Sequence, residues 1–351
     1  MKKELLKIFQ VAVVFIGTVV GAGLASGKEI SNFFTSFGPK SFIGILICGA
    51  LYISMGIIIS KISLLLNSYS EVMHVISPNI FGKLTGIITT LYFISSASII
   101  LAGSGALIHQ FFGIPKIIGT LIMLCISLFF LLRGTEGLIE VNSFIVPGLI
   151  LTISLITTLY IAFGNDVMTI DNIIHAPAKK SGVFISTLLY SGYNILCSSG
   201  VLVPLSTKMK KSKTMVIGIV LGALGLTFLS LAINSLLLIN QPYIYEYEIP
   251  LLFIAQRFGP IVQAILSMII LLEMFSTEVS DVYSIGKTLE QTFKIKFNLG
   301  IVIVLAIALP ISQIGFGTLI STLYPMFGFL SLIFIAQCII FYFKHRKEMT
   351  N

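Results

Sequence analysis

Long apolar segments separated by short polar connections make up almost the whole chain. A helix that crosses the hydrocarbon core of a bilayer needs roughly 20 apolar residues, and ten segments reach or approach that length. We predict membrane-spanning helices over residues 8–36, 41–62, 84–112, 116–132, 140–163, 182–205, 214–238, 259–289, 297–311 and 316–343. A shorter apolar run over 250–258 predicts a short helix at one membrane face. The pattern therefore predicts an all-α integral membrane protein with a single transmembrane domain over residues 1–351.

Composition supports this class. Apolar residues make up 56% of the chain and charged residues only 10%, against about 25% charged in an average soluble domain. So few charges cannot cover the surface of a soluble protein, and so apolar a chain does not stay disordered.

The basic residues predict the orientation of the chain. If the N-terminus is cytoplasmic, 16 of the 22 Lys and Arg residues lie inside, 5 lie outside, and Lys28 falls within the first span. This excess follows the positive-inside rule. It predicts a multi-pass plasma-membrane protein with both termini in the cytoplasm. The basic residues behind the net charge of +8 are then explained by the orientation of the chain in the membrane, and we expect no nucleic-acid partner.

The first predicted span carries four glycines within residues 17–27. Each weakens a helix by about 1 kcal/mol relative to alanine. Small residues can serve tight helix packing in lipid. They can also mark an unwound stretch whose free N–H groups hold a carboxylate and whose carbonyls hold a cation. The residues alone leave both interpretations open.

The pattern Gly-x-x-Val-Gly-x-Gly over residues 17–23 resembles the broken-helix motif of sodium-coupled LeuT-fold transporters, in the amino acid–polyamine–organocation superfamily. The longer string over residues 17–30 resembles YkvI-like bacterial membrane proteins, and that resemblance extends over the whole chain. It implies two inverted repeats of five helices, 8–163 and 182–343, with the first and sixth helices broken. The sixth carries Gly192, Asn194 and a Ser-Ser-Gly run in mid-span; one kinked packing helix is the alternative.

The resemblance implies a solute site near the bilayer midplane, between the two breaks. The candidate solute contacts are Thr18, Gly21, Ala22, Gly23, Tyr92, Ser96, Tyr190, Tyr193 and Asn194. For the small polar residues of the third helix, close packing is the alternative. Lys28 and Glu29 follow the first break and form either an outer gate or solute contact, or a local pair near the outer interface.

A polar stripe runs along the span 259–289. At 100° per residue, seven polar side chains share one helix face: Glu273, Ser276, Thr277, Ser280, Asp281, Ser284 and Lys287. Glu278 lies off this face. Because charge at the bilayer centre costs several kcal/mol, we expect the stripe to point into the protein or into water.

The resemblance also implies a sodium ion between the first and eighth helices. Its ligands would be the carbonyls of Gly17, Val20 and Glu273 and the hydroxyls of Ser276 and Thr277. Two alternatives remain open: proton coupling through Glu273, Glu278 or Asp281, and no coupling ion, with the two hydroxyls making ordinary interhelical hydrogen bonds.

These expectations combine into a secondary transporter that moves a small solute by alternating access, driven by sodium or protons. An amino acid or a related amine or acid is the expected solute. The chain has no Trp, which disfavours a quaternary-ammonium cage, although Tyr and Phe could substitute. A nutrient sensor resembling the membrane subunit of germinant receptors is the alternative. Motifs for enzymatic catalysis are missing, so we expect no enzyme and no cofactor other than sodium.

Overall fold

The computed structural model describes residues 2–65, 80–133, 138–164, 169–209 and 212–346, and these form helices joined by short connections. The helices are α1 (Lys2–Ala25), α2 (Lys28–Phe33), η1 (Thr35–Phe37), α3 (Lys40–Leu65), α5 (Ile80–Phe112), α6 (Lys116–Arg133), α7 (Leu138–Phe163), α8 (Ile170–Ile174), α9 (Val183–Met209), α10 (Ser212–Ile239), η2 (Tyr243–Tyr245), α11 (Pro250–Gln256), α12 (Pro260–Phe293), α13 (Phe297–Ser312) and α14 (Phe316–Lys344). The described residues contain no strand.

The predicted all-α membrane architecture is confirmed. Every predicted span coincides with a helix or, in the first span, with α1 and α2 together. Eight of the described helices are long and apolar enough to cross a membrane. The other two are α9, which carries many polar residues, and α13, which has only 16 residues. The short helix predicted over 250–258 is α11. Large apolar side chains are exposed on the outside of the bundle, among them Phe144, Leu151 and Phe329, as expected for a surface in contact with lipid.

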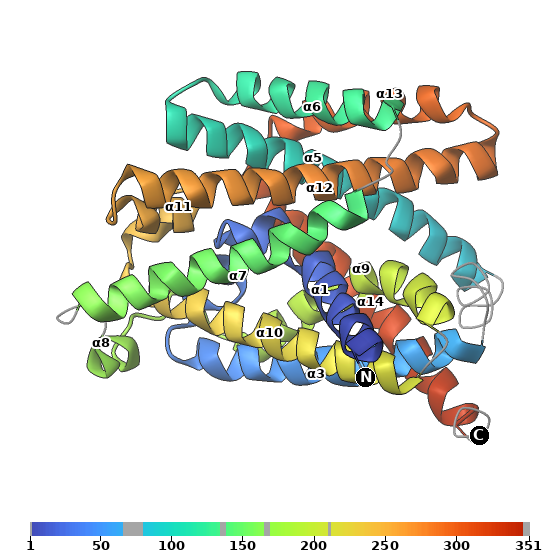
Figure 1. The fold of residues 1–351 in the computed structure, drawn as a ribbon, viewed down its shortest axis with the longest axis horizontal. Coiled ribbons are helices and arrows are strands. Elements are labelled where there is room, and N and C mark those ends of the chain that lie inside the picture. The colour runs from blue at the N-terminus through green and yellow to red at the C-terminus, as the bar shows by residue number, and fades with distance from the viewer. Residues whose placement is uncertain (1, 66–79, 134–137, 165–168, 210–211, 347–351) are drawn as a thin grey trace.

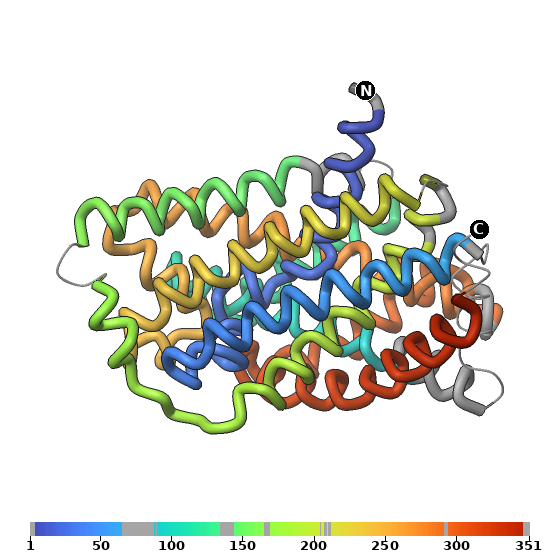
Figure 2. The backbone as a smooth tube through the Cα atoms, turned by 90° about the horizontal axis from the view of Figure 1, so that it is seen from below, coloured from blue at the N-terminus to red at the C-terminus, as the bar shows by residue number. Residues whose placement is uncertain are grey.

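The long helices run roughly along one axis in two groups (Figures 1 and 2). In one group α5 packs against α6, α12 and α13. In the other, α3 and α14 pack against α9, and α10 packs against α3. α1 crosses the centre of the bundle and contacts both groups through α10 and α12. Its middle section is therefore surrounded by protein, where an irregular backbone is tolerated.

The predicted break in the sixth helix is wrong, because α9 continues from Val183 to Met209. Its polar side chains bond within the helix. The hydroxyls of Ser198 and Ser199 donate to carbonyls three residues earlier, at 3.1 and 2.6 Å. The Asn194 amide donates to the Tyr190 carbonyl at 3.0 Å. Residues that are poor helix formers in water thus remain helical once their polar groups have partners.

Close packing explains the glycines at the contact between α9 and α14. A Cβ on Gly328 would overlap the carbonyl oxygen of Leu189, and a Cβ on Gly192 would lie 2.6 Å from Ser331 Oγ. The two backbones can approach this closely only because neither position has a side chain. Gly192, predicted to be a helix breaker, is a packing residue.

We expect Gly328→Ala to destabilise the folded protein by about 1–3 kcal/mol, because the new methyl group must push two helices apart. Thermal unfolding of the purified protein in detergent measures the effect. Gly200→Ala is the control, since a Cβ there meets nothing within 4 Å. Equal unfolding midpoints for the two variants would contradict this account of the α9–α14 contact.

Candidate solute and ion site

The helix α1 is interrupted at Gly21, which has φ 43° and ψ −175°. A second glycine with positive φ, Gly27 at 80°, separates α1 from α2. Residues with a side chain rarely adopt such angles. The other glycines of the motif have different roles. A Cβ on Gly23 would overlap the carboxyl group of Glu29, so this glycine makes room for a buried acid.

Glu29 points into the bundle from α2 and is only 2% exposed. The Tyr190 hydroxyl donates a hydrogen bond to Glu29 Oε2 at 2.8 Å, and Tyr324 is a second hydrogen-bond partner. Lys28 turns away, and its Nζ donates to the Tyr247 carbonyl at 2.7 Å. The two neighbours therefore do not form the local pair that was one of our alternatives.

An aromatic cluster lies beside Glu29, with rings from α2, α5, α9 and α14. Its members are Phe33, Tyr92, Tyr190, Tyr193 and Tyr324. The rings of Tyr193 and Tyr324 stack with centroids 4.0 Å apart. Tyr92 lies 5.4 Å from Tyr193, and Phe33 lies 5.2 Å from Tyr190 and 6.4 Å from Tyr324. Four helices thus present aromatic faces to one buried region.

A second polar group joins this cluster to α1 and α12. The Tyr92 hydroxyl donates to Cys197 Sγ at 2.9 Å, and Cys197 Sγ lies 3.7 Å from the Thr18 carbonyl, just before the α1 break. Asp281 on α12 bonds to Ser96 on α5. Asp281 is 8% exposed and lies within electrostatic range of Cys197 and Tyr92. Side chains from α5, α9 and α12 therefore meet beside the interrupted segment of α1.

The buried face of α12 differs from the polar stripe that we predicted. Ser280 on the stripe is exposed and Thr277 and Ser284 are half-buried, whereas Glu278, which we placed off the stripe, is fully buried. The Ser280 hydroxyl can be exposed because it donates within its own helix, to the Ser276 carbonyl at 2.8 Å. An ionised carboxyl group has no proton to donate to a carbonyl of its own helix, so it is not left facing lipid. All three acids of α12 at positions 273, 278 and 281 are therefore buried, whereas among the hydroxyls of the stripe only Ser276 is.

Three carboxyl groups on α12 have buried oxygens without a hydrogen-bond partner. These are Oε2 of Glu273, both oxygens of Glu278 and Oδ2 of Asp281. In the described part of the chain, none of the three residues takes part in an ion pair. A buried carboxylate without a partner is costly. Each group therefore needs a proton or a bound cation.

The structure brings some of the predicted solute contacts together in one region, while others bond elsewhere. Tyr92, Ser96, Tyr190 and Tyr193 lie in the region described above, and Gly21 is the break itself. Two other candidates use their side chains locally. The Thr18 hydroxyl donates to the Val14 carbonyl at 2.7 Å, and the Asn194 amide bonds within α9. Ala22 is buried next to the break.

Sequence reasoning missed Cys197, Tyr324 and Phe33. A signal existed for Cys197, because residues 190, 193 and 197 have helical spacing and share one face of α9. Tyr324 carried no signal beyond its position before Pro325 in a predicted span.

The expected sodium ligands lie on two helices in contact. α1 packs against α12, Ser276 is buried and Thr277 is half-buried. No group of three or more His, Cys, Asp or Glu suited to a metal occurs among the described residues. A sodium site built from carbonyl and hydroxyl oxygens does not need such a group, so this ligand set stays a prediction.

A cavity of about 250 Å³ lies between α2, the start of α9 and α14. Its lining includes Asn32, Phe33, Lys180, Ser186 and Ser321. Phe33 also belongs to the aromatic cluster, so this cavity borders the cluster on the α2 side.

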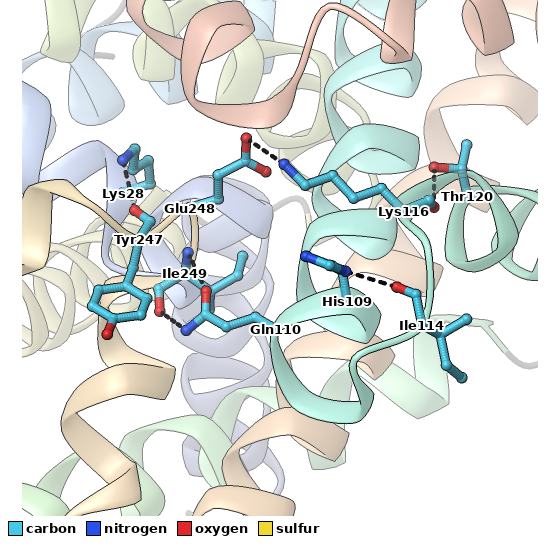
Figure 3. A network of polar contacts seen from close by, with 9 residues as sticks. All are labelled: Lys28, His109, Gln110, Ile114, Lys116, Thr120, Tyr247, Glu248 and Ile249. Atoms are coloured by element: carbon cyan, nitrogen blue, oxygen red, sulfur yellow. Dashed lines mark hydrogen bonds and ion pairs between the residues drawn. The ribbon is translucent and has the colours of Figure 1, made fainter.

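The connection between α10 and α12 is bonded to α2, α5 and α6, and to the junction between α1 and α2 (Figure 3). The Gln110 amide makes two hydrogen bonds with the backbone of Ile249, at 3.0 and 3.1 Å. Glu248 forms an ion pair with Lys116 at 3.1 Å. The Leu251 N–H donates to the Ser26 carbonyl at 3.0 Å. Together with the Lys28 contact, these bonds tie α1, α2, α5 and α6 to one segment.

Comparison with curated proteins places the chain among bacterial membrane proteins. It is 31% identical over 337 residues to the uncharacterized membrane protein YkvI of Bacillus subtilis, and the match covers 93% of both chains. The chain belongs to the YkvI family. The uncharacterized protein YyaD of the same organism is 23% identical over 330 residues, covering 93% of this chain and 94% of YyaD. No protein-family model matches.

Solved structures place this YkvI-family chain in the LeuT fold. Inward-facing Mhp1 has a TM-score of 0.71 and 13% identity, covering 97% of this chain and 77% of Mhp1. MhsT in complex with L-phenylalanine has a TM-score of 0.69 and 13% identity, and the match covers 93% of this chain and 88% of MhsT. An Eremococcus coleocola manganese transporter has a TM-score of 0.64 and 14% identity, and the match covers 96% of this chain and 79% of the transporter. These neighbours are transporters, and at such identities the likeness concerns the fold.

Proposed function

We propose that this protein is a secondary transporter that moves a small solute across the plasma membrane by alternating access. The observation that carries the proposal is the break of α1 at Gly21 within the bundle, beside buried polar side chains from α5, α9 and α12. Interrupted helices in membrane transporters mark the solute site. The fold shared with known transporters supports the same conclusion. An amino acid or a related amine or acid is the expected solute, and both termini lie in the cytoplasm.

Coupling to a proton gradient is favoured over coupling to sodium. The support is the set of unpartnered carboxyl oxygens on α12, because each of these groups can carry a proton through the membrane interior. The sodium site formed by α1 carbonyls and the hydroxyls of Ser276 and Thr277 is the alternative. It is supported by the contact between α1 and α12.

Transport itself is tested with the purified full chain in liposomes under imposed proton or sodium gradients. Labelled amino acids and amines are offered in turn, and accumulation of at least one is expected when the gradient is inward. Protein-free liposomes and collapsed gradients are the controls. If a ligand raises the unfolding temperature of the protein but no solute accumulates under any gradient, the protein is a sensor and the transport proposal fails.

The double variant Ser276→Ala, Thr277→Ala separates the two coupling ions. With protons as the driving ion, we expect proton-driven uptake to change by less than about threefold, the effect of one average interhelical hydrogen bond. Initial uptake rates at fixed gradients measure this. Thr288→Ala is the control, because its hydroxyl bonds within α12 and is exposed. Sodium-driven uptake that the double variant abolishes would establish the sodium site instead.

A further inference from the structure

Two buried carboxyl groups reach the region beside the α1 break from different helices. Glu29 comes from α2 and Asp281 from α12, and each is more than nine-tenths buried. Both lie within electrostatic range of Cys197, whose Sγ accepts the hydrogen bond from Tyr92. Oδ2 of Asp281 has no hydrogen-bond partner. The two acids therefore act on one small region.

No basic side chain of the described residues neutralises this pair of acids. Lys28, which precedes Glu29 in the sequence, donates a hydrogen bond from its Nζ to the carbonyl of Tyr247 (Figure 3). The described ion pairs of the chain involve neither Glu29 nor Asp281. A solute with net negative charge would add like charge to a region of low dielectric constant. A positively charged solute would supply the missing counterion.

The aromatic rings supply the second requirement for holding an organic cation. Tyr193 and Tyr324 stack at 4.0 Å, and Tyr92 follows at 5.4 Å from Tyr193. Tyr193 and Tyr324 each lie within electrostatic range of Glu29. Aromatic faces attract an ammonium group within about 6 Å of the ring centroid, and most strongly where water is excluded. Tyrosines here take the place of the tryptophan that the chain lacks.

We propose that the solute is an organic cation, an amine of net positive charge, held by Glu29, Asp281 and the aromatic ring of Tyr193, on the face that Tyr324 does not cover. This inference rests on the proposed function, since it names the solute class of the same site. It distinguishes amines and cationic amino acids from zwitterionic and acidic amino acids. A metal ion fits less well, because the described residues contain no group of three or more His, Cys, Asp or Glu side chains that could hold one.

Binding to the purified full chain in detergent tests the inference without requiring transport. Isothermal titration and thermal unfolding are measured with lysine, putrescine and choline as cations, norleucine as the uncharged analogue of lysine, glutamate as an acid, and manganese chloride. At least one organic cation is expected to bind and to raise the unfolding midpoint. Norleucine and glutamate are expected to bind at least about tenfold more weakly, the difference that one desolvated ionic or cation–π contact produces.

Variants then assign the binding to this region. We expect Glu29→Gln and Asp281→Asn each to weaken cation binding by about tenfold or more, as loss of a charged hydrogen bond does. Asp171→Asn is the matched control, because Asp171 lies on α8 and its side chain is 82% exposed. If either buried variant fails to fold, the pair Tyr193→Phe and Tyr193→Leu decides: phenylalanine keeps the ring and the binding, and leucine loses both.

The outcomes separate the two proposals. Cation binding that depends on these residues, without accumulation in liposomes, upholds the solute class and overturns transport. Binding and uptake of norleucine or glutamate, with no cation bound, overturns the solute class and leaves transport intact. Manganese binding that needs Glu29 and Asp281 also overturns the inference, and so does a panel in which nothing binds.

Discussion

Gly21→Ala is expected to lower the initial rate of solute uptake by about 5- to 150-fold while the protein still folds. Gly21 has φ 43° and ψ −175°, and holding a residue with a Cβ in such a conformation costs about 1–3 kcal/mol, which corresponds to that range of rates at 1.4 kcal/mol per tenfold. A new methyl group meets nothing within 4 Å, so the effect comes from the backbone alone. The variant favours a straighter α1, whose carbonyl and N–H groups pair with each other and are lost to the solute.

Gly113→Ala is the matched control for this prediction. Gly113 lies just after α5 and has φ 72°, and a Cβ added there would likewise meet nothing within 4 Å. Both variants therefore place a Cβ at a positive φ, one at the break and one away from it. Uptake rates and unfolding midpoints are measured for both. Equal losses of uptake would mean that strain in general, and not the break, limits transport.

The fold was predictable because the membrane imposes a simple requirement on each helix. Twenty apolar residues form a span wherever they occur, and this local rule placed the long helices. The break at Gly21 was predictable from a local signal as well, because the four glycines within residues 17–27 weaken the helix at that point. The break expected in α9 failed because serine and asparagine can satisfy their polar groups on neighbouring carbonyls, which composition alone does not reveal.

The side-chain contacts of the site were less accessible from sequence. Glu29 and Tyr190 are 161 positions apart and meet through their carboxyl and hydroxyl groups. Periodicity along one helix cannot predict which distant ring a buried acid will contact. The α12 stripe shows the same limit. Angles on a helical wheel located the polar side chains correctly, but the packing of α12 decided which of them are buried, and it selected Glu278.

Glu278→Gln is expected to abolish proton-driven accumulation of the solute while leaving exchange of solute across the membrane in place. Glu278 is fully buried, and neither of its carboxyl oxygens has a hydrogen-bond partner. It lies one helical turn from Asp281 and within electrostatic range of it. A carboxyl group in this position can take up a proton on one side of the membrane and release it on the other. Glutamine has nearly the shape of the protonated acid but cannot release the proton.

The assay compares two modes of transport in the same liposomes. Accumulation under an inward proton gradient requires the proton to be released, whereas exchange of labelled for unlabelled solute requires only that the binding site alternate between the two sides. Glu290→Gln is the control, because Glu290 lies near the end of the same helix, with its side chain 42% exposed and paired with Lys287 at 2.8 Å. Loss of both modes in Glu278→Gln would indicate a structural role. If the variant retains both accumulation and exchange, the coupling proton belongs to another acid of α12. A group that never changes its protonation state cannot link the proton gradient to the movement of the solute.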